Sequence, residues 1–321
     1  MPFFDGHNDV LIRLSDDQPQ AWLTGHPATH LDLPRARRAG MFGGLFAIYT
    51  ESQWGQPIDP AVAVAHTDCV IDRLNRMLDH ANDSVRLVRN MAELDACVRA
   101  GAFAVVLHIE GAEAVAADLS NLDYWYERGV RSLGLTWSRT NAFAQGVGPG
   151  DTGEGLTAAG RDLVRQCNAR GIAVDLSHLN DAGFRDVADL SQTPLIASHS
   201  NARPLCPNER NLTDDQLNAI RNSAGIVGMN FHAAFLRENG TPQSTSVRDI
   251  ADHACYIVDR IGVDHVGLGS DFDGCDIPAD LVDVTGLPRL ADTLRDRGAS
   301  QADLDLFNWK NWRRVLQATW K

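Results

Sequence analysis

The sequence FFDGHND at residues 3–9 leads from two apolar residues to a histidine and an aspartate two positions apart. Side chains at positions i and i+2 of a β-strand point to the same face of the sheet. His7 and Asp9 would therefore project together from the end of an N-terminal strand, offering a nitrogen and an oxygen to a cation. A surface turn after that strand is the alternative, and the partners of this pair must be sought elsewhere in the chain.

Short apolar runs alternate with helical patterns along the whole chain. Eight runs predict strands, at residues 3–9, 43–49, 102–110, 130–137, 172–177, 195–199, 226–230 and 266–271. Seven segments with apolar residues at i, i+3 and i+4 predict helices between them, at residues 62–82, 91–100, 121–128, 157–170, 181–190, 213–222 and 247–261. Because most of the strands are continuously apolar, we predict a parallel (β/α)8 TIM-type barrel, with a doubly wound open sheet as the alternative.

The length of 321 residues fits two ordinary domains or one such barrel. We expect a single barrel domain over residues 1–321, with a helical C-terminal extension from about residue 286 that packs against it. Residues 141–155 are too rich in glycine for regular structure. This loop follows the fourth strand, so it would lie on the active-site face, either as a lid or as a passive surface loop.

Composition argues against several classes of partner. The formal net charge of −13 disfavours nucleic acids and anionic membranes. No segment approaches the ~20 apolar residues of a membrane span, and the start lacks the features of a signal peptide. The six cysteines are scattered, as is typical of reduced thiols in a chain that is not exported. We expect a cytoplasmic protein with no nucleic-acid or membrane partner.

The active site of such a barrel lies at the C-terminal ends of its strands. Imidazoles and carboxylates gather at five of the predicted ends, namely His7, Asp9, Glu110, His178, His199 and Asp271. These side chains are ligands of Zn²⁺-type ions, which usually take three or four each. The number of candidates exceeds one tetrahedral site and fits two ions that share a carboxylate such as Glu110. Such a pair makes a bridging hydroxide nucleophilic at neutral pH.

Each candidate has a simpler explanation as a buried histidine, a turn or a helix cap, but their coincidence favours a metal site. We interpret His108, Asp175 and Asp273 as supporting residues. The loop after His199 carries two arginines and two prolines. A guanidinium fixed beside a metal centre suits a substrate carboxylate. The alternative to substrate binding is that such an arginine pairs with Glu209 or with a backbone carbonyl.

Taken together, these segments resemble the membrane (renal) dipeptidase family, metallopeptidases of the amidohydrolase-like barrels. The matching blocks run in order from residue 5 to residue 274: DGHND (5–9), EG (110–111), GVRSLGLT (129–136), DLSH (175–178), SHSNAR (198–203), RNL (210–212) and GSDFDG (269–274). The resemblance implies that His7 and Asp9 bind one zinc, that His178 and His199 bind the other, and that Glu110 bridges them.

The resemblance also implies a substrate. The family cleaves dipeptides with a free amino terminus, and many members accept a D-residue at the second position. Arg210 would hold the C-terminal carboxylate of the dipeptide. Asp271 would lie near the free amino group and the bridging water, where it can handle protons.

The chain departs from the family at Trp137, where many members carry a histidine that contacts the reacting carbonyl oxygen. An indole donates one hydrogen bond but cannot titrate. The metals could supply the stabilisation, another group could take over, or the substrate could differ. We therefore count Trp137 and Asn141, at the start of the glycine-rich loop, among the candidate substrate-binding residues.

The main expectation is a dizinc dipeptidase acting on small dipeptides, with Mn²⁺, Fe²⁺ or Co²⁺ as alternative occupants. The second reading is a metal-dependent hydrolase of another amide, such as an N-acyl amino acid. The third is a metal-binding protein without catalysis. A homodimer is an open expectation, since the sequence does not decide the oligomeric state.

Overall fold

The computed structural model of the chain describes residues 1–53 and 56–321. Within these residues, nine parallel strands form one sheet in the order β2-β1-β9-β8-β7-β6-β5-β4-β3, and β2 also pairs with β4. This last pairing closes eight strands into a barrel and leaves β3 outside it. The strands are β1 (Phe3–Asn8), β2 (Met41–Tyr49), β3 (Val85–Leu87), β4 (Phe103–Glu110), β5 (Val130–Gly134), β6 (Ala173–Asp175), β7 (Ile196–Ala197), β8 (Ile226–Met229) and β9 (Val266–Leu268). The predicted (β/α)8 barrel is confirmed.

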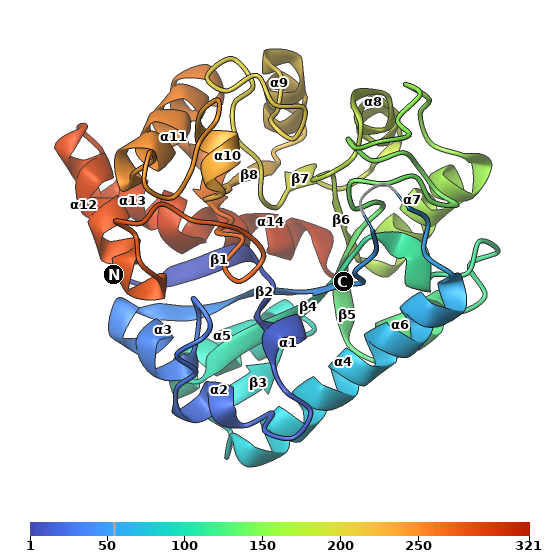
Figure 1. Cartoon of the computed structure of the whole chain (residues 1–321), viewed down its shortest axis with the longest axis horizontal. Helices are drawn as coiled ribbons and strands as arrows, with labels where there is room; N and C mark the ends of the chain where they lie inside the picture. Colours follow the sequence, from blue (N-terminus) through green and yellow to red (C-terminus); the bar gives the residue numbers. More distant parts are fainter. Residues whose placement is uncertain (54–55) are drawn as a thin grey trace.

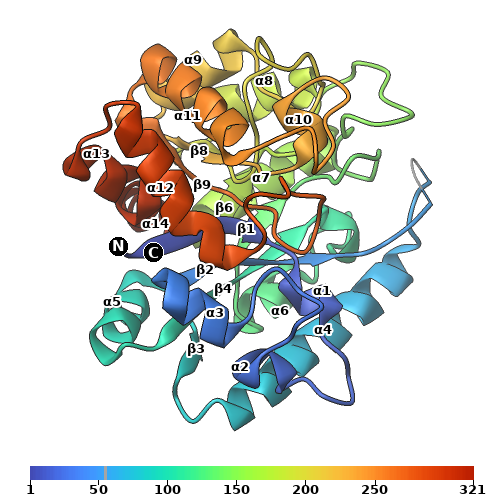
Figure 2. The same cartoon turned by 60° about the vertical axis from the view of Figure 1, so that its left-hand side comes forward.

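Helices surround the barrel in both cartoon views (Figures 1 and 2). All seven helices predicted between strands are present, as α4 (Pro60–His80), α5 (Met91–Ala100), α6 (Leu122–Glu127), α7 (Ala158–Arg170), α8 (Asp181–Leu190), α9 (Asp214–Asn222) and α11 (Val247–Ile261). Thr213 and Gln216 form a capping box at the start of α9. None of the described helices is both long and apolar enough to cross a membrane.

The sequence analysis missed several short elements. The strand β3 fills a gap beside β4, because β3 pairs with Phe103–Val105 whereas β5 pairs with β4 only from Leu107 onward. Four helices are too short to show a periodic pattern, namely α1 (Val10–Arg13), α2 (Ala21–Thr24), α3 (Leu33–Ala39) and α10 (Ala233–Leu236). The predicted C-terminal extension comprises α12 (Leu287–Asp296), α13 (Gln301–Asp305), a π-helical turn (Leu306–Lys310) and α14 (Asn311–Thr319).

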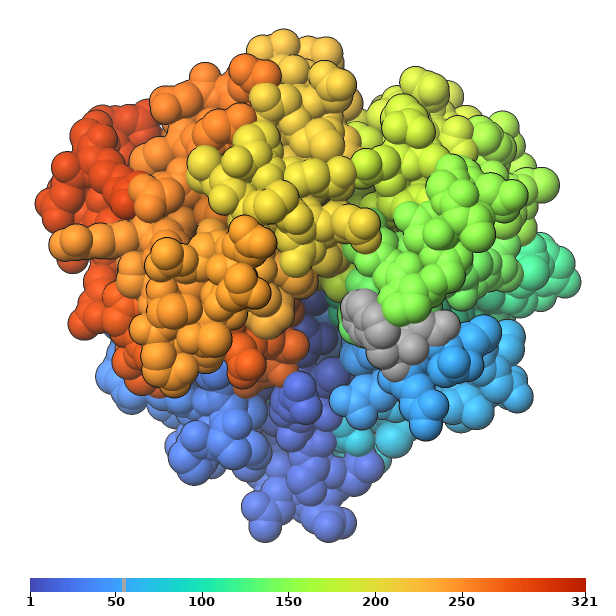
Figure 3. Space-filling model, turned by 45° about the horizontal axis from the view of Figure 1, so that its top comes forward, coloured from blue at the N-terminus to red at the C-terminus, as the bar shows by residue number. Residues whose placement is uncertain are grey.

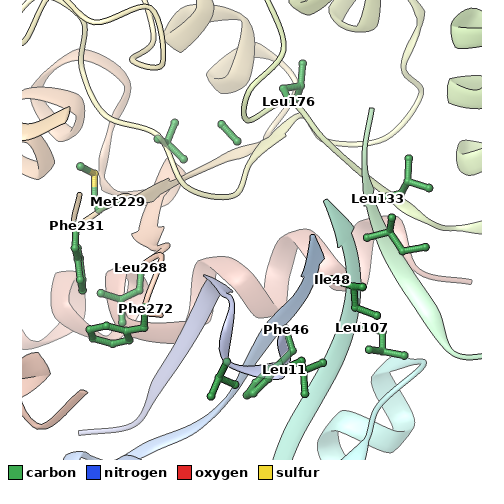
Figure 4. Packing of buried hydrophobic residues seen from close by; sticks show 14 of the residues in the cluster. Leu11, Phe46, Ile48, Leu107, Leu133, Leu176, Met229, Phe231, Leu268 and Phe272 are labelled. Carbon is green, nitrogen blue, oxygen red and sulfur yellow. The ribbon is translucent and has the colours of Figure 1, made fainter. Parts of the chain in front are cut away.

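Alternation along β4 explains how the core and the site are separated. Phe103, Val105, Leu107 and Ile109 belong to the hydrophobic layer between the sheet and the helices. Leu107 lies in this layer with Phe46, Ile48 and Leu133 (Figure 4). The alternate residues 104, 106, 108 and 110 face the barrel interior. The first two are apolar and the last two are His108 and Glu110, so the interior turns from apolar to polar toward the C-terminal end of the strand.

The helix α14 closes the apolar end of the barrel. It lies behind β1 and β2 in Figure 1, and its Trp312, Val315 and Leu316 join Phe4 and the other interior residues in one buried cluster. The Trp312 indole nitrogen donates a hydrogen bond to the Leu268 carbonyl at 2.7 Å. A Cβ at Gly6 would lie 2.1 Å from the Trp312 ring, so β1 needs glycine here. The polar C-terminal end of the barrel is thus left to the functional site.

Candidate active site

The structure brings the five predicted metal ligands together at the C-terminal end of the barrel. The Nε2 atom of His7 lies 3.5 Å from Asp9 Oδ2 and 3.7 Å from Glu110 Oε1. The same Glu110 oxygen lies 2.9 Å from His178 Nε2 and 3.3 Å from His199 Nε2. Glu110 therefore lies between two pairs of side chains. His7 and Asp9 stand at the end of β1, and His178 and His199 follow β6 and β7. One carboxylate in this position could contact ions held by both pairs.

The donor atoms of this cluster fit divalent cations. His7 Nε2 and Asp9 Oδ1 are buried and have no hydrogen-bond partner. Burial raises the pKa of Glu110 to about 8, and burial together with the Asp9 carboxylate raises the pKa of Asp271 to about 7. Cations at this point would pair with the unpartnered atoms and neutralise the crowded carboxylates.

The pKa values of the three imidazoles are shifted in opposite directions by their surroundings. Burial lowers the pKa of His7, but the Glu110 and Asp9 carboxylates outweigh it and raise that pKa to about 10. Burial, Arg210 and His7 hold the pKa of His178 well below its usual value, and the same three influences lower the pKa of His199. These two histidines are therefore neutral at pH 7, which is the form that binds a metal ion.

Asp175 has its carboxylate occupied by other donors, although it could form a metal-binding group with His7 and His199. Its Oδ1 accepts the backbone N–H groups of Ser177 and Ser198, at 3.1 and 2.8 Å. Its Oδ2 accepts the Ser198 hydroxyl at 2.5 Å. We therefore interpret Asp175 as a support for the histidines and not as a ligand.

Asp271 follows β9 and faces the other half of the cluster. One of its oxygens lies within 4.8 Å of ligand atoms of His7 and Asp9. Its Oδ2 accepts a hydrogen bond from the Asn230 side chain at 3.0 Å. A Cβ at Gly274 would lie 2.1 Å from Asp9 Oδ2 and 2.4 Å from Asp271 Oδ1. The missing side chain thus leaves both carboxylates open to the cavity.

Arg210 presents a buried guanidinium, only 7% exposed. Its Nη2 donates to the His199 carbonyl at 3.0 Å, and its Nη1 donates to the Ser200 hydroxyl at 3.3 Å. Its Nε is buried without a hydrogen-bond partner. The carbonyl contact considered from the sequence is therefore present, whereas no carboxylate of the described residues, Glu209 included, forms an ion pair with Arg210. Its positive charge remains available to an anionic group.

A cavity of about 1060 Å³ covers the cluster, and Asp9, Glu110, His178, Arg210 and Asp271 are among the residues that line it. Figure 3 shows a hollow at this place between the orange, yellow-green and blue parts of the surface. One wall is aromatic. The Trp137 ring lies 5.0 Å from the Tyr49 ring and is stacked on His178 at 5.8 Å.

The structure does not bring Asn141 to the cavity. Its side-chain amide donates to the Leu135 carbonyl at 2.8 Å and accepts the backbone N–H groups of Phe143 and Ala144. Asn141 therefore shapes the start of the glycine-rich loop instead of lining the site. The loop reaches the cavity through Val147.

Comparisons with known proteins agree with this geometry. The family model described as membrane dipeptidase (peptidase family M19) matches residues 1–321. The chain belongs to this family of metallopeptidases. Dipeptidase aclJ of Aspergillus oryzae is 33% identical over 329 residues, covering 98% of this chain and 78% of that protein. Dipeptidase tcpJ of Claviceps purpurea is 31% identical over 328 residues, covering 98% and 76%.

A solved structure of similar shape comes from Rhodobacter sphaeroides. It is a metallopeptidase liganded with a phosphinate mimic of the dipeptide L-Ala-D-Ala. It superposes with a TM-score of 0.95 at 42% identity, and the match covers 100% of this chain and 99% of that one. The predicted membrane dipeptidase family and its dipeptidase class are thereby confirmed.

Sequence reasoning missed three residues that hold this dipeptidase site in place. Asn230 contacts Asp271, as described above. Ser138 Oγ lies 2.8 Å from His178 Nδ1, and Ser198 Oγ lies 2.7 Å from His199 Nδ1. Each of the three directly follows a strand or lies a few residues beyond one. The strand-end rule thus places them near the site, but it does not single them out from other polar residues there.

A buried ion pair supports the aromatic wall and gives a stability prediction. Arg139 is fully buried, lies 5.3 Å from the Trp137 ring and donates to Glu113 Oε1 at 2.9 Å. Replacing Glu113 by alanine would leave the guanidinium charge uncompensated, so we expect the free energy of unfolding to fall by about 3–5 kcal/mol. Denaturant titration would measure the loss.

The matched control for this prediction is Glu113→Gln, which keeps the size of the side chain and one acceptor oxygen. It should lose less stability than Glu113→Ala. A loss below ~1 kcal/mol for Glu113→Ala would show that the pair does not support the fold.

Proposed function

We propose that the protein is a two-metal dipeptidase that hydrolyses dipeptides with free amino and carboxyl termini. The observation that carries this proposal is the setting of Arg210. Its guanidinium is buried beside His199, has no carboxylate partner among the described residues and lines the same cavity as Glu110 and Asp271. A buried cation beside a cluster of metal ligands suits a substrate that ends in a carboxylate a short distance from the scissile bond.

The chemistry of the donor set suits two ions. His7 and Asp9 would hold one ion, His178 and His199 would hold the other, and Glu110 would contact both. When bound, two such ions polarise the scissile carbonyl and lower the pKa of a water molecule toward neutrality. Histidine and carboxylate ligands favour zinc, and Mn²⁺, Fe²⁺ or Co²⁺ could take the same places.

The side chains of the protein would do the remaining work. Arg210 would bind the C-terminal carboxylate of the substrate through two hydrogen bonds and so limit its length. Asp271, held by Asn230, would take a proton from the attacking water and pass it to the leaving amine. Both residues line the cavity that contains Glu110, so a dipeptide could contact them together.

A D-residue at the second position is part of the proposal. The Rhodobacter sphaeroides metallopeptidase was solved with a mimic of L-Ala-D-Ala, and it is 42% identical over the full chain. This similarity supports acceptance of a D-residue here. The Trp137 wall motivates the alternative substrate class, because an apolar surface could receive an N-acyl group.

A substrate panel on zinc-loaded protein tests the function. The panel contains L-L and L-D dipeptides, a tripeptide and N-acyl amino acids. We expect turnover of the dipeptides only, with L-D members among the substrates. Absence of turnover for every dipeptide, in protein that holds about two zinc ions per chain, would contradict the proposal. Faster cleavage of N-acyl amino acids would favour the alternative substrate class.

The role of Arg210 predicts a specific kinetic change. Arg210→Met should raise KM for free dipeptides and lower kcat/KM by roughly 10–150-fold, since hydrogen bonds to charged groups contribute ~1.5–3 kcal/mol. Hydrolysis of the corresponding dipeptide amide, which lacks the carboxylate, should change little.

The matched control for Arg210→Met is Arg203→Met on the same loop. Arg203 pairs with both oxygens of Asp181 at 2.8 Å, and it does not line the main cavity. KM should stay close to the wild-type value in this variant. An unchanged KM in Arg210→Met would remove the assigned role.

A further inference from the structure

The three imidazoles of the site share an orientation. In each, Nε2 faces Glu110, as described above, and Nδ1 faces a serine hydroxyl. His178 Nδ1 lies 2.8 Å from Ser138 Oγ. The other two share one hydroxyl: Ser198 Oγ lies 2.7 Å from His199 Nδ1 and 3.4 Å from His7 Nδ1. Ser198 thus contacts one assigned ligand from each half of the centre.

The proton of the Ser198 hydroxyl goes to its nearest neighbour, the Asp175 carboxylate, and Ser177 Oγ lies farther away at 3.4 Å. A hydroxyl donates one hydrogen bond and accepts two, whereas a carboxylate only accepts. Asp175 Oδ2, at 2.5 Å, therefore takes the Ser198 proton. With that proton committed, Ser198 Oγ can only accept from its other neighbours, so an imidazole that bonds to it must donate N–H from Nδ1. In the neutral form that binds a metal ion, both rings therefore carry their one proton on Nδ1, away from the centre, and turn the Nε2 lone pair toward it.

The position of the Asp175 side chain is fixed by its surroundings. It ends β6, is 1% exposed, and its second oxygen is fixed by two backbone N–H groups. Ser198 directly follows β7 and is fully buried. We propose that Ser198, backed by Asp175, is a positioning residue that sets the tautomer of one ligand of each ion and thereby couples the two metal sites. This inference rests on the proposed two-metal centre.

The first test is metal binding by the apoprotein, measured by calorimetric titration with Zn²⁺ and by the visible absorption of bound Co²⁺. Ser198→Ala removes the shared acceptor, so the affinity for both ions should fall, by about 10–100-fold each. Ser138→Ala should weaken only the site that contains His178. Ser132→Ala is the matched control, because Ser132 Oγ contacts His108 Nδ1 at 2.9 Å and His108 is not an assigned ligand. This control should bind both ions as the wild type does.

The second variant, Asp175→Asn, shows whether metal affinity depends on the tautomer of the histidines or only on how the side chains pack. In Asp175→Asn the side-chain oxygen must face the two backbone N–H groups, so its NH₂ group faces Ser198 and donates to it. Ser198 must then give its own proton to another acceptor, and His199 Nδ1 at 2.7 Å is nearer than Ser177 Oγ at 3.4 Å. Donation to His199 forces that ring to carry its proton on Nε2. We expect Asp175→Asn to lose at least as much affinity as Ser198→Ala, although it conserves shape. Ser198→Thr, which keeps the hydroxyl, should bind better than Ser198→Ala.

Three results would overturn the inference. They are wild-type affinity for both ions in Ser198→Ala and Asp175→Asn, a loss confined to one ion in both variants, or an equal loss in Ser132→Ala. Wild-type protein that fails to bind two ions would instead contradict the proposed function, so the two failures can be told apart.

Discussion

Glu110→Gln is expected to remove both ions from the protein and to lower activity by at least about 10³-fold, because two catalytic ions together supply several kcal/mol of barrier reduction. One oxygen of Glu110 lies 2.9 Å from His178 Nε2 and 3.3 Å from His199 Nε2. The same oxygen lies 3.7 Å from His7 Nε2. A side chain amide has the same shape but lacks the negative charge that two neighbouring cations require.

The measurement for Glu110→Gln is metal content after purification and after incubation with excess Zn²⁺, together with kcat/KM on a dipeptide substrate. The variant should fold, because the change removes a buried charge without changing volume. Glu113→Gln is the control in the same segment: Glu113 pairs with Arg139 and is not an assigned ligand, so this variant should keep its metal. Two tightly bound ions in Glu110→Gln would exclude a bridging role.

The barrel could be predicted because its signals are local. Each strand of the closed barrel contains a short apolar run, and seven of the connecting helices show a full periodic face. The clustering of the candidate ligands could be predicted because strand ends in a parallel barrel must meet at one face. Alternation along β4 places Glu110 in the interior once the strand is recognised, and the same rule places His108 one layer below it.

Other features depend on contacts that the sequence does not encode locally. The strand β3 has three residues and exists because β5 leaves part of β4 unpaired. Ser138 and Ser198 matter through the imidazoles that they contact, and serine is too common for its position alone to reveal this. Asn141 was placed at the site by its neighbourhood in sequence, but an asparagine at a loop start readily bonds the backbone of its own turn.

Trp137 is the residue at which this chain departs from many members of its family, and the structure shows what surrounds it. It follows β5 and lies in the cavity wall between Tyr49 and His178, with the Arg139 guanidinium 5.3 Å from its ring. The wall is therefore aromatic, and it lies beside His178 in one half of the assigned metal centre. We therefore expect its shape to bear on which substrate side chains are accepted.

Asp271→Asn is expected to lower kcat by about 10²–10⁴-fold, the usual contribution of a general acid–base group, while both ions are retained and KM changes little. The carboxylate faces His7 and Asp9 across the open space at Gly274, and Asn230 fixes its Oδ2 at 3.0 Å. An amide in this position can still accept a hydrogen bond from Asn230, but it cannot take a proton from water. The loss should therefore fall on the chemical step.

The control for Asp271→Asn is Asp273→Asn two residues away. Asp273 is also buried and lines the cavity, but its Oδ1 accepts the His30 backbone N–H at 2.5 Å and so links two loops. Its replacement should leave kcat within a few-fold of the wild type, since the asparagine oxygen can still accept the His30 N–H and Asp273 has no assigned part in the proton transfer. The metal content of the Asp271→Asn variant shows whether Asp271 is a metal ligand or has no part in the reaction. Loss of one ion in Asp271→Asn would make Asp271 a ligand alongside His7 and Asp9, whereas a kcat within tenfold of wild type with both ions present would remove it from the reaction.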